Sequence, residues 1–311
     1  MIDILFAATG ERWEDYRDPL LAAFAAQGLD VHLHRDTTRP ETVDFIIYAP
    51  NGSVTDFSPF TNVRAVFNLW AGVETVVTNP TLTQPLCRMV DSGLTRGMVE
   101  WVTGHVLRHH LGMDAHIHGQ DGIWREGLVP PLAKDRPVGI LGLGALGLAC
   151  GEALAGLGFP VAGWSRSPKT HAQIACHAGE DGLKAVLREA QILVLLMPQT
   201  PQTENLMDAG RLALLPQGAV VINPGRGPLI DDAALIAALD AGHLAHATLD
   251  VFRDEPLPPD HAFWAHPKVT VTPHIASVTR PGTAAEAIAE NLAGFLAGRP
   301  LQNLVDRSRG Y

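Results

Sequence analysis

A glycine pattern between an apolar run and a helical segment is the feature that most constrains the fold of this chain. Three glycines follow the apolar residues 138–141 and open a segment whose apolar residues recur at helical spacing. In such a strand-turn-helix unit the glycines permit a tight turn, the approach of a pyrophosphate to the backbone, and close helix-strand packing. The pattern predicts a dinucleotide site on the helix amides; the alternative is a glycine-rich turn that binds nothing. The expected site consists of Gly142, Gly144, Ala145, Leu146 and Gly147.

Apolar runs alternate with helical segments on both sides of this pattern, which is typical of an α/β protein. In the first third we expect a helix over 19–27 and strands at 2–7, 31–34, 45–48 and 64–67. A long helix is expected over 98–111 and a last helix over 284–296. Six further strands are expected at 138–141, 161–164, 192–196, 219–222, 245–249 and 269–272.

A chain of 311 residues exceeds the usual size of one hydrophobic core, so two domains are expected. We predict a doubly wound parallel sheet of Rossmann type over 98–276 as the nucleotide domain. Residues 1–97 and 277–311 should form a smaller, flavodoxin-like α/β substrate domain. The ligand should lie in the cleft between the two domains.

Charge and composition exclude several classes of function. The formal net charge is -10 and no run of basic residues occurs, which argues against nucleic acid as a partner. No leader peptide and no apolar stretch of about 20 residues is present, so we expect neither export nor a membrane anchor. Cys87, Cys150 and Cys176 form no paired motif, which favours a reducing cytoplasm and no metal site.

The histidines other than His274 are expected to have no function. His105 and His109 have the spacing of a zinc-protease helix, but Val106 stands where that motif requires a glutamate.

The segment after the second strand of the nucleotide domain indicates the cofactor. An NAD-binding unit usually has an acidic residue there for the ribose hydroxyls, and residues 164–169 contain none. Arg166 could bind a 2′-phosphate, with Ser165 and Ser167 as donors and Lys169 as a further charge. NADP is therefore favoured over NAD, which stays possible; the alternative is an ordinary exposed arginine on a turn.

Three residues with side chains suited to catalysis, an arginine, a glutamate and a histidine, follow strands of the same domain. Arg226, Glu255 and His274 lie where a parallel sheet collects its ligands. Arg226 could hold a carboxylate and a carbonyl, while His274 could give a proton to that carbonyl and Glu255 could favour the protonated imidazole. Taken singly, the three could equally be a capping charge, a turn acid and a core histidine.

At this point the chain resembles the D-2-hydroxyacid dehydrogenase family, and within it the glyoxylate/hydroxypyruvate reductase A group. The motifs that carry the resemblance run nearly end to end: 71–74, the glycine pattern, 164–166, 225–227, 249–252, 255–258, 272–274, 279–281 and 306–311.

The resemblance implies that Arg226, Glu255 and His274 are catalytic and that Asp250 binds the nicotinamide carboxamide. It also implies that the amides of Ala71, Gly72 and Val73 hold the substrate carboxylate, and that two copies form a homodimer through their nucleotide domains.

Two residues depart from the family pattern. Pro224 precedes the Gly-Arg pair, and Trp70 precedes Ala71 where relatives often have a smaller residue. Trp70 would either narrow the pocket or form an apolar wall against Phe67. Either way the substrate range, and not the reaction, is affected.

The resulting prediction is an NADPH-preferring reductase of small 2-oxo acids, with glyoxylate and hydroxypyruvate as first candidates. One alternative is an NAD-dependent relative of phosphoglycerate or D-lactate type. The other is a non-catalytic, dinucleotide-sensing interaction protein.

Overall fold

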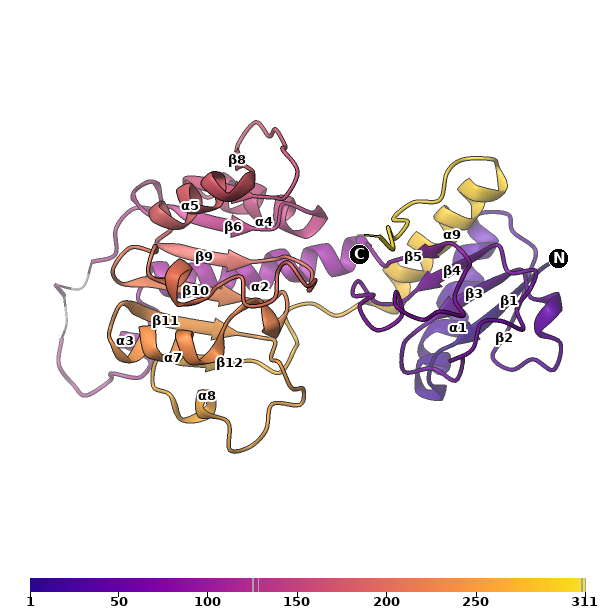
Figure 1. Ribbon diagram of the computed structural model, residues 1–311, viewed down its shortest axis with the longest axis horizontal. Coiled ribbons are helices and arrows are strands. Elements are labelled where there is room, and N and C mark those ends of the chain that lie inside the picture. The colour runs from indigo at the N-terminus through magenta and orange to yellow at the C-terminus, as the bar shows by residue number, and fades with distance from the viewer. Residues whose placement is uncertain (125, 128, 309, 311) are drawn as a thin grey trace. The chain divides into compact units, whose positions relative to one another are not determined.

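The computed structural model describes residues 1–124, 126–127, 129–308 and 310. The chain divides into two compact units (Figure 1). Unit 1 comprises Met1–Leu94 and Val278–Tyr311, and unit 2 comprises Thr95–Ser277. In the described part of the chain, no helix combines the length and the apolar character that crossing a membrane requires.

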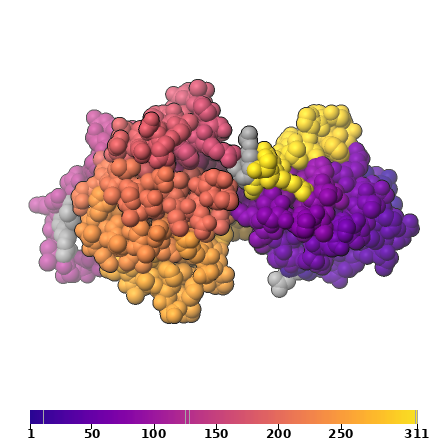
Figure 2. Space-filling view, in the orientation of Figure 1, coloured from indigo at the N-terminus to yellow at the C-terminus, as the bar shows by residue number. Residues whose placement is uncertain are grey.

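Unit 1 contains a five-stranded parallel sheet with the order β2-β1-β3-β4-β5. Its strands are β1 (Ile2–Ala7), β2 (Val31–His34), β3 (Phe45–Tyr48), β4 (Ala65–Asn68) and β5 (Leu86–Cys87). Helices α1 (Gly10–Ala26) and α9 (Pro281–Leu296) pack against each other and bury one face of this sheet. The C-terminal helix therefore lies against the N-terminal one, and in Figure 2 the yellow C-terminal surface rests on the purple surface of the same unit. A short 3-10 helix, η1, covers Pro40–Thr42.

Helix α1 begins nine residues earlier than Pro19, where the sequence predicted its start. The buried residues Tyr16, Leu20 and Phe24 share one face of the helix, so the apolar face continues through Pro19. The proline lies inside the helix, and packing against the sheet outweighs the hydrogen bond that it cannot make. Strand β5 was not predicted, because two residues carry no periodicity.

Unit 2 contains a seven-stranded parallel sheet with the order β12-β11-β10-β9-β6-β7-β8. Its strands are β6 (Val138–Leu141), β7 (Val161–Trp164), β8 (Ala175–His177), β9 (Ile192–Leu195), β10 (Ala219–Asn223), β11 (Leu244–Leu249) and β12 (Val269–Val271). The six predicted strands are confirmed, and β8 is an additional edge strand whose residues are only partly buried. Its weak apolar character explains why the sequence did not indicate it.

Helices cover both faces of this sheet. Helices α2 (Ser92–His110) and α4 (Ala145–Gly156) contribute to one apolar cluster, and α5 (Gly179–Glu189) and α7 (Asp232–Asp240) contribute to the other. This is the doubly wound arrangement that the sequence predicted. The shorter helices are α3 (Met113–Ile117), α6 (Ala209–Leu212) and α8 (Ala262–Ala265), with 3-10 turns η2 (Ala133–Asp135) and η3 (Gly227–Leu229).

The strand order reverses at β6, which pairs with β7 on one side and with β9 on the other. At such a point the connections that follow two adjacent strands run to opposite faces of the sheet. A crevice opens between them at the carboxyl ends of the strands. The glycine pattern follows β6 directly, so the fold places it at this switch point.

Candidate active site

The glycine residues after β6 differ in the space around them. Gly142 has φ +108°, and a Cβ there would lie 2.5 Å from the carbonyl oxygen of Leu196. A Cβ on Gly147 would lie 1.8 Å from the carbonyl oxygen of Gly142. By contrast, nothing lies within 4 Å of the position of a Cβ on Gly144, the residue before α4.

Gly144 therefore presents open backbone at the N-terminus of a 12-residue helix. Free amides and the positive end of the helix dipole favour an anion at such a terminus. The residues present fit the pyrophosphate of a dinucleotide.

The turn after β7 contacts the same glycine segment. Lys169 Nζ donates to the carbonyl oxygen of Leu143 at 2.6 Å, and Ser165 Oγ donates to the carbonyl oxygen of Ser167 at 2.8 Å. Arg166 is exposed. Lys169 thus fixes the turn to the glycine segment, a role that the sequence did not indicate because the two residues are 26 positions apart.

His274 and Glu255 form a direct pair. Nδ1 of His274 lies 2.7 Å from Oε2 of Glu255, and Oε1 of Glu255 accepts from the amide of Phe252 at 2.9 Å. Because Nδ1 is hydrogen-bonded to the Glu255 carboxylate, Nε2 is the imidazole nitrogen that remains available for proton transfer.

The hydrogen bond that His274 donates to the Glu255 carboxylate raises the pKa of His274; burial and the charge of Arg226 oppose this, while the charges of Glu255 and Asp250 add to it. For Glu255, burial acts to raise the pKa, but the hydrogen bonds of His274 and Phe252, with the charges of His274 and Arg226, outweigh it and lower the pKa. The pair thus favours an imidazolium beside a carboxylate. Since Arg226 acts on both pKa values, its guanidinium is within electrostatic range of the pair.

The backbone of His274 adopts φ 54°, in the left-handed region that side chains with a Cβ rarely occupy. Asp250 holds the residues around it. The fully buried Asp250 carboxylate accepts from the amides of Ile275 and Ala276 at 2.9 and 2.8 Å and from the hydroxyl of Thr272 at 2.5 Å. The amide of His274 donates to the Asp250 carbonyl oxygen at 2.8 Å. Sequence reasoning missed this positioning role of Asp250.

Arg226 lies on the loop after β10. Buried Asn223 donates to the carbonyl oxygen of Arg226 at 2.9 Å and accepts from the amide of Gly225 at 3.1 Å. Nη1 of Arg226 donates to the Gly225 carbonyl oxygen at 2.7 Å. A Cβ on Gly227 would lie 2.0 Å from the carbonyl carbon of Phe252, so only glycine lets the Arg226 and Glu255 loops touch.

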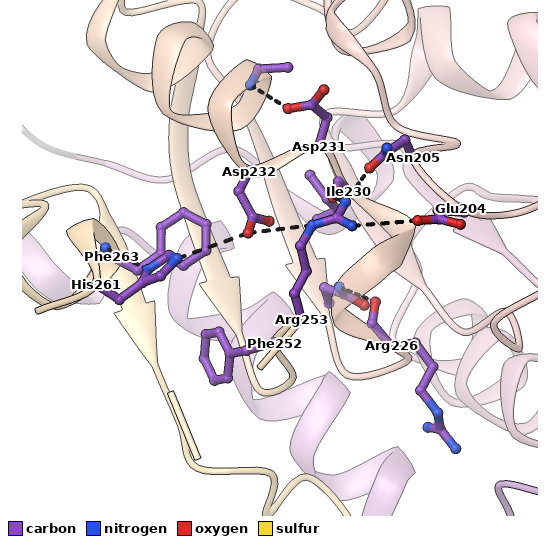
Figure 3. Close-up of polar contacts among 12 residues, drawn as sticks. Glu204, Asn205, Arg226, Ile230, Asp231, Asp232, Phe252, Arg253, His261 and Phe263 are labelled. Carbon is purple, nitrogen blue, oxygen red and sulfur yellow. Dashed lines mark hydrogen bonds and ion pairs between the residues drawn. The ribbon is translucent and has the colours of Figure 1, made fainter. Parts of the chain in front are cut away.

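Arg253, which lies on the loop of Glu255, contacts residues that follow Arg226 in the chain (Figure 3). Its Nη2 donates to the carbonyl oxygen of Ile230 at 2.5 Å and to the side chain of Asn205. Its guanidinium also pairs with Asp232 at 3.6 Å and with Glu204 at 3.9 Å. The side chain of Arg226 points away from this cluster (Figure 3). No local sequence pattern indicated Arg253, because its partners come from two separate segments, 204–205 and 230–232.

The predicted carboxylate-binding residues lie in unit 1, on the loop after β4. Buried Asn68 donates to the carbonyl oxygens of Trp70 and Gly72 at 2.8 and 3.0 Å. The side chain of Val73 is buried and that of Trp70 is 39% exposed. Asn68 therefore fixes the course of the loop that contains Ala71.

A dinucleotide-type glycine turn and an imidazole-carboxylate pair at one edge of a doubly wound sheet define a nucleotide-dependent oxidoreductase. Comparison with known proteins bears this out. Residues 103–276 match the family model of the D-isomer specific 2-hydroxyacid dehydrogenase, NAD binding domain. The chain belongs to the D-isomer specific 2-hydroxyacid dehydrogenase family, as the sequence motifs indicated.

Among its relatives, glyoxylate/hydroxypyruvate reductase A of Yersinia enterocolitica is 40% identical over 80% of this chain and 82% of that protein. The same enzyme of Salmonella heidelberg is 37% identical over the same shares of both chains.

Solved structures agree. A D-isomer specific 2-hydroxyacid dehydrogenase from Xanthobacter autotrophicus, in complex with NADPH and MES, has a TM-score of 0.92 and 41% identity over 99% of both chains. The NADPH-dependent glyoxylate/hydroxypyruvate reductase of Sinorhizobium meliloti, in complex with NADP and sulfate, has a TM-score of 0.86 and 34% identity over the whole of both chains.

Proposed function

We propose that this chain is an NADPH-preferring reductase of small 2-oxo acids, with glyoxylate and hydroxypyruvate as its first substrates. The observation that carries the proposal is the 2.7 Å pair of His274 and Glu255 within the electrostatic range of Arg226. These residues follow strands of the sheet that also presents the glycine turn. The relatives named as reductases of these two substrates support the choice.

Each residue has a distinct role in the proposed reaction. When bound, NADPH supplies the hydride. Arg226 holds the carboxylate and the carbonyl of the substrate through its fork of donors. Nε2 of His274 donates the proton to the carbonyl oxygen, and Glu255 keeps the imidazole charged until then. The amides of Ala71, Gly72 and Val73 are the proposed ligands of the substrate carboxylate.

The cofactor preference rests on the turn after β7. Residues 164–169 offer no carboxylate to the ribose hydroxyls, and Arg166 is exposed there. Ser165, Ser167 and Lys169 are the other proposed contacts of the 2′-phosphate. Asp250 is the proposed partner of the nicotinamide carboxamide. The family neighbours that contain NADPH or NADP support the same preference.

His274→Ala is the direct test. If Nε2 of His274 is the proton donor, kcat for glyoxylate reduction should fall by about 10²–10⁴-fold, with the KM for NADPH nearly unchanged. The measurement is NADPH consumption at saturating glyoxylate. His266→Ala is the matched control, because His266 also pairs with a carboxylate, that of Asp240 at 3.2 Å, outside the site.

A loss of less than tenfold would assign the proton to another group. No reduction of any 2-oxo acid by the unmodified protein, with either NADPH or NADH, would favour the dinucleotide-sensing alternative. Activity confined to NADH would instead favour the phosphoglycerate or D-lactate type.

We also propose a homodimer in a reducing cytoplasm. Large apolar side chains are exposed in the described part of segment 111–132; they are Leu111, Met113, Ile117, Ile123, Trp124, Val129 and Leu132. A second copy that covers this segment would remove them from water. The three cysteines are free thiols, as a reducing compartment would keep them.

A further inference from the structure

Three side chains with metal-binding atoms lie together at the edge of the sheet in unit 1. Asp3 on β1 is the register partner of His32 on the edge strand β2. His34 is two residues further along β2, so it points to the same face as His32. One ligand atom from each residue lies within 4.8 Å of the other two.

Both ring nitrogens of His34 face oxygen atoms. Its Nδ1 lies 3.0 Å from the carbonyl oxygen of Asp36, which can only accept. Its Nε2 lies 2.5 Å from Oδ1 of Asp3. A neutral imidazole has a single N–H and cannot donate to both oxygens. With the proton on Nδ1 donated to the Asp36 carbonyl oxygen, the lone pair of Nε2 is directed at the Asp3 side chain, where a metal ion could accept it.

The surroundings favour a metal ion. A backbone carbonyl on Nδ1 is the usual partner of a metal-binding histidine, because it fixes the tautomer and directs Nε2 at the ion. The ring of His32 stacks on that of His34 with centroids 4.9 Å apart, which brings a second imidazole nitrogen into the group. The carboxylate of Asp44 accepts from the amide of Asp3 at 2.9 Å and adds negative charge nearby.

We propose that Asp3, His32 and His34 bind one divalent transition metal ion, with Zn²⁺ as the test ion. Two imidazoles and a carboxylate suit this class of ion, and the donors of a tetrahedral zinc site lie about 3.4 Å apart. The side chains of Asp3, His32 and His34 are 27%, 54% and 17% exposed, so small rotations bring the donors to that spacing and water completes the coordination. A bound ion would join β2 to β1.

Two other histidines provide matched controls. His171 and His266 each pair with a carboxylate through Nε2, at 2.9 and 3.2 Å. In both, however, Nδ1 accepts from a backbone amide, that of Gln173 or Lys268. A neutral ring satisfies both contacts, so neither pair requires a cation.

Zn²⁺ alone is the probe, titrated calorimetrically into the full chain after treatment with a chelator. The unmodified protein should bind one equivalent more tightly than any further ions. His32→Gln, His34→Gln and Asp3→Asn should each raise the Kd of that equivalent at least tenfold, while His171→Gln and His266→Gln should leave it unchanged. One equivalent of Zn²⁺ should also raise the Tm of the unmodified protein, and a chelator should reverse the rise.

Circular dichroism shows whether each variant is folded; His32 is the safest substitution because its side chain is the most exposed of the three. The proposal fails if the unmodified protein binds no Zn²⁺. It fails equally if His32→Gln and His171→Gln bind alike. Neither result depends on the reductase activity.

Discussion

His274 combines an uncommon backbone conformation with a paired imidazole. Its φ of 54° is maintained because Asp250 binds the amides of Ile275 and Ala276 and accepts from the amide of His274 itself. Backbone strain of this kind costs on the order of 1–3 kcal/mol and is found mostly at functional sites. The conformation directs the imidazole toward Glu255.

Glu255→Gln tests the proton-donor role through pH. Glu255 raises the pKa of His274, so its carboxylate extends the protonated, reducing form to higher pH. Without that charge the pKa of His274 should fall, and glyoxylate reduction should decline at lower pH than in the unmodified protein. At pH 8 we expect kcat/KM for glyoxylate to fall by roughly tenfold or more.

The measurement is the pH profile of kcat/KM for glyoxylate with NADPH. Asp254→Asn removes a neighbouring exposed acid and should leave the profile in place. An unchanged midpoint in Glu255→Gln would mean that Glu255 does not set the protonation of His274.

Arg166→Ala tests the cofactor preference. Loss of a charge-assisted contact with a 2′-phosphate should raise the KM for NADPH about tenfold, since such contacts contribute about 1.5–3 kcal/mol. The KM for NADH should change little. Steady-state kinetics with both cofactors measure this, with Arg188→Ala at the end of α5 as the control. Equal effects on both cofactors would rule out the assignment.

The positions of the candidate residues could be predicted where they follow from the end of a strand. Arg226, Glu255 and His274 each come after a strand of a parallel sheet, and parallel strands present their carboxyl ends at one edge. The roles of Asp250 and Lys169 depend on hydrogen bonds to residues 25 and 26 positions away, which no local pattern contains. The spacing of His32 and His34 could have indicated that both lie on one face of a strand, but their approach to Asp3 depends on the pairing of β1 with β2.

At the level of elements, Arg253 connects the loop of Arg226 with the loop of Glu255. It lies two residues before Glu255 and donates to the carbonyl oxygen of Ile230, just after η3. Arg253→Ala should therefore displace both loops. We expect a higher KM for glyoxylate, because Arg226 moves, and about a tenfold loss of kcat, because 1 Å of misplacement is costly to catalysis.

Arg253→Lys should recover little, since one ammonium group cannot reach both Asp232 and Ile230 as the guanidinium does. The kinetics and the pH profile of both variants are compared with their Tm. A lower Tm with unchanged kinetics would show a purely structural role.

Element boundaries were less predictable than the elements themselves. The residues Tyr16, Leu20 and Phe24 lie on one helical face, yet Pro19 between them indicated a helix start. In strand β8 one exposed residue is followed by two partly buried ones, so no alternation of buried and exposed residues marks the strand. In both cases tertiary packing, and not local propensity, decides the outcome.

For the whole molecule, the exposed apolar side chains in the described part of segment 111–132 bear on assembly. Trp124 is 87% exposed and Ile123 is 65% exposed. Trp124→Asp combined with Ile123→Asp should convert the proposed dimer into a monomer, because charges replace the apolar surface of the contact. Light scattering after size-exclusion chromatography measures the mass. Leu157→Asp, at an exposed position after α4, should leave it unchanged.

A monomeric unmodified protein would contradict the dimer. A dimer that persists in the double variant would place the contact elsewhere.

Unit 1 is assembled from both ends of the polypeptide, whereas unit 2 is one uninterrupted segment. A ribosome therefore completes residues 95–277 before it makes α9, the helix that packs on α1. Until then the apolar cluster that contains Tyr16, Leu20 and Phe24 lacks the residues that α9 contributes to it. Unit 2 can therefore fold during synthesis before unit 1 does. Unit 1 can complete its fold only after α9 has been synthesised.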